Sequence, residues 1–202
     1  MGVSERDVVM PNLLHRIDDL RMRAERSVLV LVDYQQHLMS AIAEGEAVVQ
    51  RAGFLGEVAQ TLGVPVLGTA QNPDKLGPNL PPVADHLDRV LAKQAFGAAE
   101  VGVGAAVAEF DEAEHYREVV IAGCEAHVCL LQTALGLVEG GRRVWVVADA
   151  SGSRHLNDRE AALARLAYAG ATVVTAEMVA FEWLRTAEHE HFRAVSRLVK
   201  AL

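Results

Sequence analysis

Six continuous apolar runs, separated by helical stretches, constrain the fold of this chain more than any other feature. Runs that are apolar at every position are typical of strands buried on both faces of a parallel sheet. Helices between such strands cover both faces of the sheet. We therefore expect an α/β fold, a three-layer αβα sandwich with a six-stranded parallel sheet. The expected strands are residues 27–33, 64–70, 88–93, 117–123, 143–149 and 171–176.

The segments between the strands predict the helices and one loop. A helical stretch follows the first strand and ends at Leu62, before Gly63. Residues 71–82 contain four of the six prolines, so we expect a loop there. Asn157 is the expected N-cap of a later helix. The other expected helices are residues 101–114, 127–139 and 157–168, and two C-terminal helical pieces that include a helix over residues 184–202.

Length and charge limit the possible functions. The 202 residues suit one domain, with residues 1–26 as an N-terminal arm. The net charge is −8 and no long basic block is present, which disfavours nucleic-acid binding. The longest apolar run, residues 28–32, is too short to cross a bilayer. Because the first 20 residues are mixed and charged, we expect a cytoplasmic protein with reduced Cys124 and Cys129.

Three ionisable residues follow the expected strands at the edge where parallel sheets bind ligands. They are Asp33, Lys93 and Cys129. Cys129 would lie in the first turn of a helix, where the helix dipole and the Lys93 ammonium favour a thiolate and lower the thiol pKa. Asp33 could take the thiol proton and return it later. Each residue alone also fits a structural interpretation: a cap, a solvated lysine, or a core cysteine as we expect for Cys124.

Five segments of the sequence match motifs of one protein family, and they occur in the same order as in that family. They are LVDYQ at 31–35, VPVLGTAQNPDKLGP at 64–78, LAKQAF at 91–96, GCEAHVCLLQTAL at 123–135 and VVADASGSR at 146–154. In these motifs the chain resembles the isochorismatase-like cysteine hydrolases, and most of all the isochorismatase-domain-containing subgroup. The resemblance extends over roughly residues 27 to 182 and implies a Rossmann-like fold.

The resemblance implies roles for the residues at the matching positions. Asp33 would be the general base, Lys93 its cationic partner and Cys129 the nucleophile. The family also places a cis peptide just before the position of Ala126, which would turn the Ala126 N–H towards the site. The Ala126 and Cys129 amides would then form an oxyanion hole. Many relatives have Thr at the Ala126 position, and Ala keeps the backbone donor. Relatives are commonly dimers or larger, so we expect a homo-oligomer, a dimer or a tetramer.

Four further residues are candidates for substrate binding. Gln35, two positions after Asp33, is expected to point the same way as Asp33, although a solvent-facing loop residue fits equally well. Gln71 and Asn72 follow the second strand, and His127 lies two residues before Cys129. All four are interpretations from position alone.

The sequence predicts neither a metal nor another cofactor. Nicotinamidases of this superfamily bind a divalent metal through an Asp-x-His pair after the second strand. This chain has Gln71-Asn72-Pro73 there, and His86 is the only histidine between that point and Lys93. One imidazole does not make a metal site. Other histidines, such as His115, are expected to be solvated.

The chemistry favours a small-molecule hydrolase. A Cys-Lys-Asp site suits acyl transfer through a thioester, so we expect a small amide or carbamoyl-type C–N bond to be cleaved. Two alternatives stay open: vinyl-ether hydrolysis of the isochorismate type, and an interaction protein that kept the fold with weak or no activity. A nucleotide-binding domain would need a glycine-rich turn after the first strand, where Asp33-Tyr34-Gln35-Gln36 stands. A phosphatase with Asp33 as nucleophile would need a second Asp at the position of Gln35.

Overall fold

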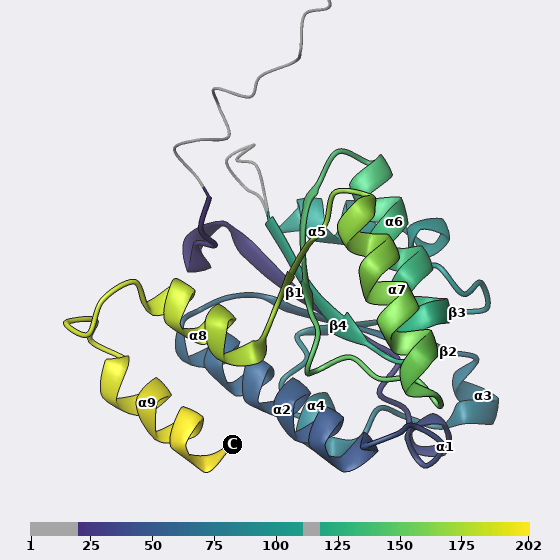
Figure 1. Ribbon diagram of the computed structural model, residues 1–202, viewed down its shortest axis with the longest axis horizontal. Coiled ribbons are helices and arrows are strands. Elements are labelled where there is room, and N and C mark those ends of the chain that lie inside the picture. Colours follow the sequence, from purple (N-terminus) through teal and green to yellow (C-terminus); the bar gives the residue numbers. More distant parts are fainter. Residues whose placement is uncertain (1–19, 111–117) are drawn as a thin grey trace, which may run out of the picture.

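The computed structural model describes residues 20–110 and 118–202 and contains a six-stranded, all-parallel sheet in the order β3-β2-β1-β4-β5-β6 (Figure 1). Each neighbouring pair of strands is in parallel register. The expected fold class is therefore confirmed. The strands are β1 (Ser27–Val32), β2 (Val66–Gln71), β3 (Arg89–Lys93), β4 (Glu118–Gly123), β5 (Arg143–Val147) and β6 (Thr172–Val174).

Helices cover both faces of the sheet and complete the three layers (Figure 1). Alternate residues of β1 point into two separate cores, as strand geometry requires. Leu29 and Leu31 pack with residues of α2 and α8, whereas Val28, Val30 and Val32 pack with residues of α5, α6 and α7. The α-helices are α1 (Gln36–Met39), α2 (Gly45–Thr61), α3 (Pro73–Leu76), α4 (Pro81–Ala84), α5 (Val103–Glu109), α6 (Leu131–Glu139), α7 (Leu156–Tyr168), α8 (Ala176–Leu184) and α9 (Phe192–Ala201). The described residues also contain two 3-10 segments, η2 (Ala24–Arg26) and η3 (Ala98–Val101), and the π-helical turn η4 (Ala126–Leu130).

Some expected helix boundaries were wrong. The stretch after β1 is two helices, α1 and α2, because the chain turns between them and Glu44 takes a left-handed conformation with φ of 55°. Asn157 is not an N-cap but lies inside α7, whose cap position is His155. The proline-rich segment holds two short helices, α3 and α4, each beginning with proline, which the first helical turn tolerates.

Other expectations fall partly outside the described residues. The helix expected over residues 101–114 is α5, and the expectation for residues 111–114 and for His115 lies in the segment that the structure does not describe, as does most of the N-terminal arm. The helix expected over 184–202 is shorter: it is α9, which begins at Phe192 and packs on α2 and α8. Within residues 20–110 and 118–202, no helix is long and apolar enough to cross a membrane.

The strand order places a topological switch at the centre of the sheet. The chain runs outward from β1 through β2 to β3, then returns to the other side of β1 with β4. Open parallel sheets bind ligands at such a point, beyond the carboxyl ends of the strands. Close approach of β1 and β4 there depends on Gly123, because a Cβ at this position would lie 2.6 Å from the Val32 carbonyl oxygen.

Candidate active site

Asp33 lies at the carboxyl end of β1 with its side chain fully buried. Its φ of 56° is left-handed, a conformation that Asp and Asn tolerate better than most residues. The hydroxyl of Thr69, on β2, donates to Asp33 Oδ1 at 2.6 Å, and Lys93 Nζ donates to Asp33 Oδ2 at 2.6 Å. Both carboxylate oxygens therefore have a donor, and Asp33 is fixed in place.

Lys93 ends β3, and its ammonium is held by three acceptors. Besides Asp33, these are Gln71 Oε1 at 2.8 Å and the Phe96 carbonyl oxygen at 3.0 Å. An ammonium has three N–H donors, so this set can use all of them. Gln71 is itself oriented, because its Nε2 donates to the Gln94 carbonyl oxygen at 2.7 Å. Gln71, expected to bind substrate, is thus placed to position Lys93.

Cys129 lies in η4, directly after β4, and is 6% exposed. Its thiol lies close enough to Asp33 and Lys93 for both side chains to act on it. The three residues singled out at the strand ends are therefore brought together in one cluster. Burial first and then the Asp33 charge raise the pKa of the Cys129 thiol, and the Lys93 charge opposes them, so that the pKa is about 12. The expected lowered thiol pKa is wrong, because burial outweighs the neighbouring cation.

The turn that carries Cys129 presents different amides from those expected. The cis peptide bond joins Cys124 and Glu125, one position earlier than expected. The Ala126 N–H donates to the Gly152 carbonyl oxygen at 2.7 Å, so it cannot serve as the expected oxyanion donor. The Val128 and Leu130 amides both donate to the Glu125 carbonyl oxygen. Among the described residues, the buried Glu125 N–H has no acceptor.

The loop after β5 is bound along this turn. Gly152 N donates to the Gly123 carbonyl oxygen at 3.2 Å, and the Glu125 carboxylate accepts from Arg154. His127 Nδ1 lies 3.0 Å from Ser153 Oγ, and His127 Nε2 lies 3.9 Å from Asp158 on α7. Residues two positions apart do not face each other on a helical turn, so His127 is directed away from the Cys129 side.

Gln35 and Asn72 also have structural partners. The fully buried Gln35 amide donates to the carbonyl oxygens of Gln71 and Gly77 and accepts from the Gln71 N–H. It holds the β2–α3 segment against β1 and has no donor left for a substrate. The Asn72 N–H donates to the Lys93 carbonyl oxygen, and its φ of 37° turns the chain into α3.

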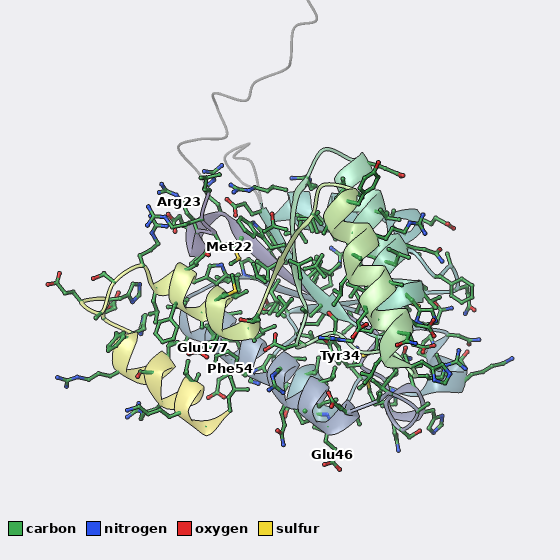
Figure 2. All side chains as sticks on the ribbon, in the orientation of Figure 1. Met22, Arg23, Tyr34, Glu46, Phe54 and Glu177 are labelled. Carbon is green, nitrogen blue, oxygen red and sulfur yellow. The ribbon has the colours of Figure 1, made fainter. Side chains whose placement is uncertain are left out.

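A second connection ties the β1 end to the β5 end. The Tyr34 hydroxyl donates to the Ala150 carbonyl oxygen at 2.6 Å across the interior, where the ring is labelled in Figure 2. Burial raises the pKa of Tyr34 well above its usual value, so it stays a neutral donor.

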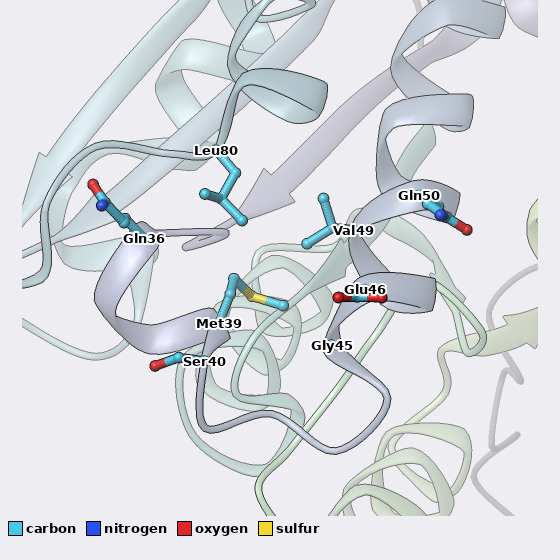
Figure 3. Close-up of a pocket in the computed structure, with 8 residues that line it drawn as sticks. All are labelled: Gln36, Met39, Ser40, Gly45, Glu46, Val49, Gln50 and Leu80. Carbon is cyan, nitrogen blue, oxygen red and sulfur yellow. The ribbon is translucent and has the colours of Figure 1, made fainter.

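Metal-binding groups are not gathered at this site. No cluster of three or more His, Cys, Asp or Glu side chains suited to a metal occurs within residues 20–110 and 118–202. The His86 ring lies 2.8 Å from Gln60 Oε1, away from the strand ends. A pocket of about 380 Å³ lies between α1, α2 and Leu80, and Figure 3 shows Met39, Val49 and Leu80 facing into it. None of the three clustered residues lines that pocket.

Three relevant residues were not singled out from the sequence. They are Thr69, Glu125 and Arg154. All three lie within the sequence motifs that match the family, but only the structure shows what they contact. Thr69 carried a usable signal: in a strand it points the same way as Gln71, two positions later.

Fold and site together define the class: a parallel-sheet α/β protein with Asp, Lys and Cys gathered beyond the carboxyl ends of its strands. The chain belongs to the isochorismatase family, since the sequence profile of the isochorismatase domain matches residues 27–178. It is 35% identical to mouse isochorismatase domain-containing protein 2A over 89% of this chain and 85% of that protein. It is 37% identical to the human isochorismatase domain-containing protein 2, over 86% and 83% of the two chains.

Two solved structures share the fold. The MAR1 ribonuclease of Caenorhabditis elegans superposes with a TM-score of 0.81 at 29% identity, over 89% of this chain and 92% of that one. The YcaC gene product of Escherichia coli, described as an octameric hydrolase of unknown specificity, superposes with a TM-score of 0.77 at 24% identity. The YcaC match covers 90% of this chain and 96% of the other. These neighbours fit the hydrolase fold of the family.

Proposed function

We propose that this chain is a cysteine-dependent hydrolase that cleaves a small amide or carbamoyl-type C–N bond through a thioester. The observation that carries the proposal is the contact of the Cys129 thiol with a buried Asp33 carboxylate that is paired with Lys93. A base, a cation and a nucleophile side by side are the parts that covalent acyl transfer needs. The membership in the isochorismatase family supports the same chemistry.

The first half-reaction begins from a protonated thiol. Asp33 accepts the thiol proton as Sγ bonds to the carbonyl carbon, and the carbonyl oxygen becomes an oxyanion. Asp33 then gives the proton to the leaving nitrogen, the C–N bond breaks, and ammonia or an amine departs. Lys93 offsets the charge of Asp33 whenever that carboxylate is ionised.

The oxyanion needs two donors, and we propose the Glu125 and Cys129 amides. The Glu125 N–H is buried without an acceptor among the residues that the structure describes. Glu125 is the N-cap residue of η4, the turn that carries Cys129, so both amides belong to the same tight turn after β4. Such donors lower the energy of the charge that develops in the transition state.

The second half-reaction hydrolyses the thioester and regenerates the free enzyme. Water attacks the thioester carbonyl carbon while Asp33 accepts a proton from the water. The C–S bond breaks, the acid or carbamate product leaves, and the proton passes from Asp33 to the Cys129 sulfur. The two amides serve again for the second oxyanion, and the cycle needs no cofactor.

Assembly into a homo-oligomer is part of the proposal. The E. coli YcaC product is described as octameric, which supports it. Light scattering after size exclusion measures the mass directly, and a monomer of 21.8 kDa at micromolar concentration would contradict it.

A broad screen tests the activity. Primary amides, carbamoyl compounds and ureido acids are incubated with the protein, and release of ammonia is followed. Intact-protein mass spectrometry of acid-quenched samples detects a thioester on Cys129, with Cys129→Ala as the blank. An acyl adduct on Cys129 with turnover supports the proposal. Turnover that survives in Cys129→Ala, or cleavage of a vinyl ether alone, contradicts it.

The name of the C. elegans neighbour gives a rival function, ribonuclease activity. The net charge of −8 disfavours it, because phosphate contacts need Lys and Arg clusters. Single-stranded RNA incubated with wild type and Cys129→Ala separates the two. Cleavage of the RNA by wild type but not by Cys129→Ala would favour ribonuclease activity over the proposed amide hydrolysis. RNA that stays intact would exclude the ribonuclease alternative. No turnover on either class of substrate would favour the interaction-protein alternative.

A further inference from the structure

We infer that Glu125 and Arg154 act as a positioning pair, which holds the Glu125 amide in place as an oxyanion donor to the Cys129 site. The inference deepens the proposed function and rests on it. It concerns the Glu125 side chain and the loop after β5. Neither takes a direct part in the acyl transfer proposed for Cys129, Lys93 and Asp33.

The Glu125 carboxylate is bound at a single oxygen by one residue. Its Oε2 accepts from the Arg154 backbone N–H at 3.0 Å and from Arg154 Nε at 3.1 Å. The Glu125 side chain is only 10% exposed, whereas that of Arg154 is 58% exposed. A carboxylate so far removed from water is strongly disfavoured unless such donors compensate it. The pair therefore fixes the Glu125 side chain in one position.

The Glu125 backbone is fixed on its other side as well. Its carbonyl oxygen accepts from the Val128 N–H at 3.1 Å and from the Leu130 N–H at 3.2 Å. With the carboxylate and the carbonyl both held, the N–H is the remaining polar group of Glu125. It has no acceptor within the part of the chain that the structure describes. Its direction is set by the two fixed groups of the same residue.

Arg154 belongs to a loop that is itself firmly bound. Gly152 bonds to the turn on both sides, through its N–H to Gly123 and its carbonyl oxygen to Ala126. The buried Ser151 hydroxyl donates to the Val147 carbonyl oxygen at 2.6 Å. Gly152 also packs closely against Ile42 on its other side, because a Cβ there would lie 2.5 Å from Ile42 Cγ2. The loop is thus a rigid support from which Arg154 reaches Glu125.

Two reagents for Cys129 separate positioning from a general structural role. Alkylation by iodoacetamide needs the sulfur but forms no oxyanion, whereas acetylation by p-nitrophenyl acetate passes through one. Removing one oxyanion donor typically lowers such rates about 100- to 1000-fold. Because Glu125→Ala keeps the N–H but frees it to move, we expect a smaller loss, about 10- to 100-fold in acetylation, with the iodoacetamide rate within about twofold of wild type. Mass spectrometry assigns both products to Cys129.

Matched variants complete the experiment. Glu125→Gln keeps an oxygen that can accept both Arg154 bonds, so we expect it to restore most of the acetylation rate. Arg154→Ala loses the Nε bond and keeps the backbone bond, so its loss is smaller than that of Glu125→Ala. Arg165→Ala, which removes an exposed arginine of α7, is the control and should match wild type.

The outcomes are distinguishable. A fall in the acetylation rate of Glu125→Ala with an unchanged alkylation rate, together with a restored acetylation rate in Glu125→Gln, supports the positioning role of Glu125 and Arg154. Equal losses with both reagents, or no loss with either, overturn it. If wild-type Cys129 reacts with neither reagent faster than Cys124 does, the proposed function fails and not merely the pair. If Glu125→Ala does not fold, Glu125→Gln and Arg154→Ala decide by the same ratio of the two rates.

Discussion

The Lys93 ammonium lies 2.6 Å from the Asp33 carboxylate, and both side chains are fully buried. The two charges offset each other, so the site as a whole is close to neutral beside the Cys129 sulfur. This balance explains why burial decides the state of the thiol, whose pKa rises to about 12. The thiol is therefore neutral beside Asp33, and in the proposed mechanism its proton moves only during attack.

Asp33→Asn should lower the thiol pKa while abolishing acyl transfer. The Asp33 charge raises that pKa and the Lys93 charge lowers it, so removing the carboxylate leaves only the cation. The wild-type rate of iodoacetamide alkylation should keep rising with pH towards pH 12, and in Asp33→Asn the same curve should lie at lower pH. At pH 8 the variant should be alkylated about tenfold faster for each unit of pKa lost.

The measurement is a set of alkylation rates between pH 7 and 10, read at the Cys129 peptide. Asn tolerates the left-handed backbone at position 33, so the substitution is conservative there. The buried Cys124, whose pKa burial also raises to about 12, is followed in the same samples and should shift in the same direction, because the Asp33 charge also acts on it. A curve that stays in place, or moves to higher pH, would show that Asp33 does not set the thiol pKa.

Thr69→Val should weaken catalysis without preventing folding. The Thr69 hydroxyl donates to Asp33 Oδ1 at 2.6 Å, and valine has nearly the same shape without a donor. A hydrogen bond to a charged group contributes about 1.5–3 kcal/mol, so kcat/KM on any substrate found should fall about 10- to 100-fold. Thr69→Ser keeps the hydroxyl and should retain most of the activity. Equal activities of the Val and Ser variants would show that the Thr69 hydroxyl does not contribute to catalysis.

Chelation should leave the activity unchanged. The sequence lacks the Asp-x-His pair, and the described residues hold no cluster of three metal-binding side chains. Dialysis against EDTA, followed by assay with and without added Zn²⁺, Mn²⁺ or Fe²⁺, checks this expectation. A loss of activity on dialysis that a divalent metal restores would contradict it.

The architecture and the three clustered residues were predictable because they depend on local patterns. Continuous apolar runs specify buried parallel strands, and parallel strands bring their carboxyl ends to one edge. Asp33 and Lys93 needed only that rule to be placed together. Lys93 could be recognised at its strand end even though β3 is a largely exposed edge strand.

The remaining features depend on contacts that no local pattern encodes. The thiol pKa depends on burial, and sequence position does not reveal how much burial opposes the nearby cation. Ala126 lost its expected role to Gly152, a residue 26 positions later, whose carbonyl oxygen takes the Ala126 N–H. Gln35 was expected to bind substrate, but its amide is used by backbone groups 36 and 42 positions away.

Gln35→Ala should destabilise the whole domain, in contrast to Gln36→Ala at the next position. The Gln35 amide makes three hydrogen bonds to the backbone of the β2–α3 segment, and its side chain is fully buried. Its removal leaves the Gln71 N–H and two carbonyl oxygens without partners, and an unsatisfied buried group costs about 1–3 kcal/mol. Since 1 kcal/mol shifts the Tm of a domain of this size by about 2–4 °C, we expect a fall of several degrees or more. Gln36 is exposed, so Gln36→Ala should shift the Tm by less than about 2 °C. Thermal unfolding followed by circular dichroism measures both variants, and equal melting temperatures would show that the Gln35 amide is not a structural tie.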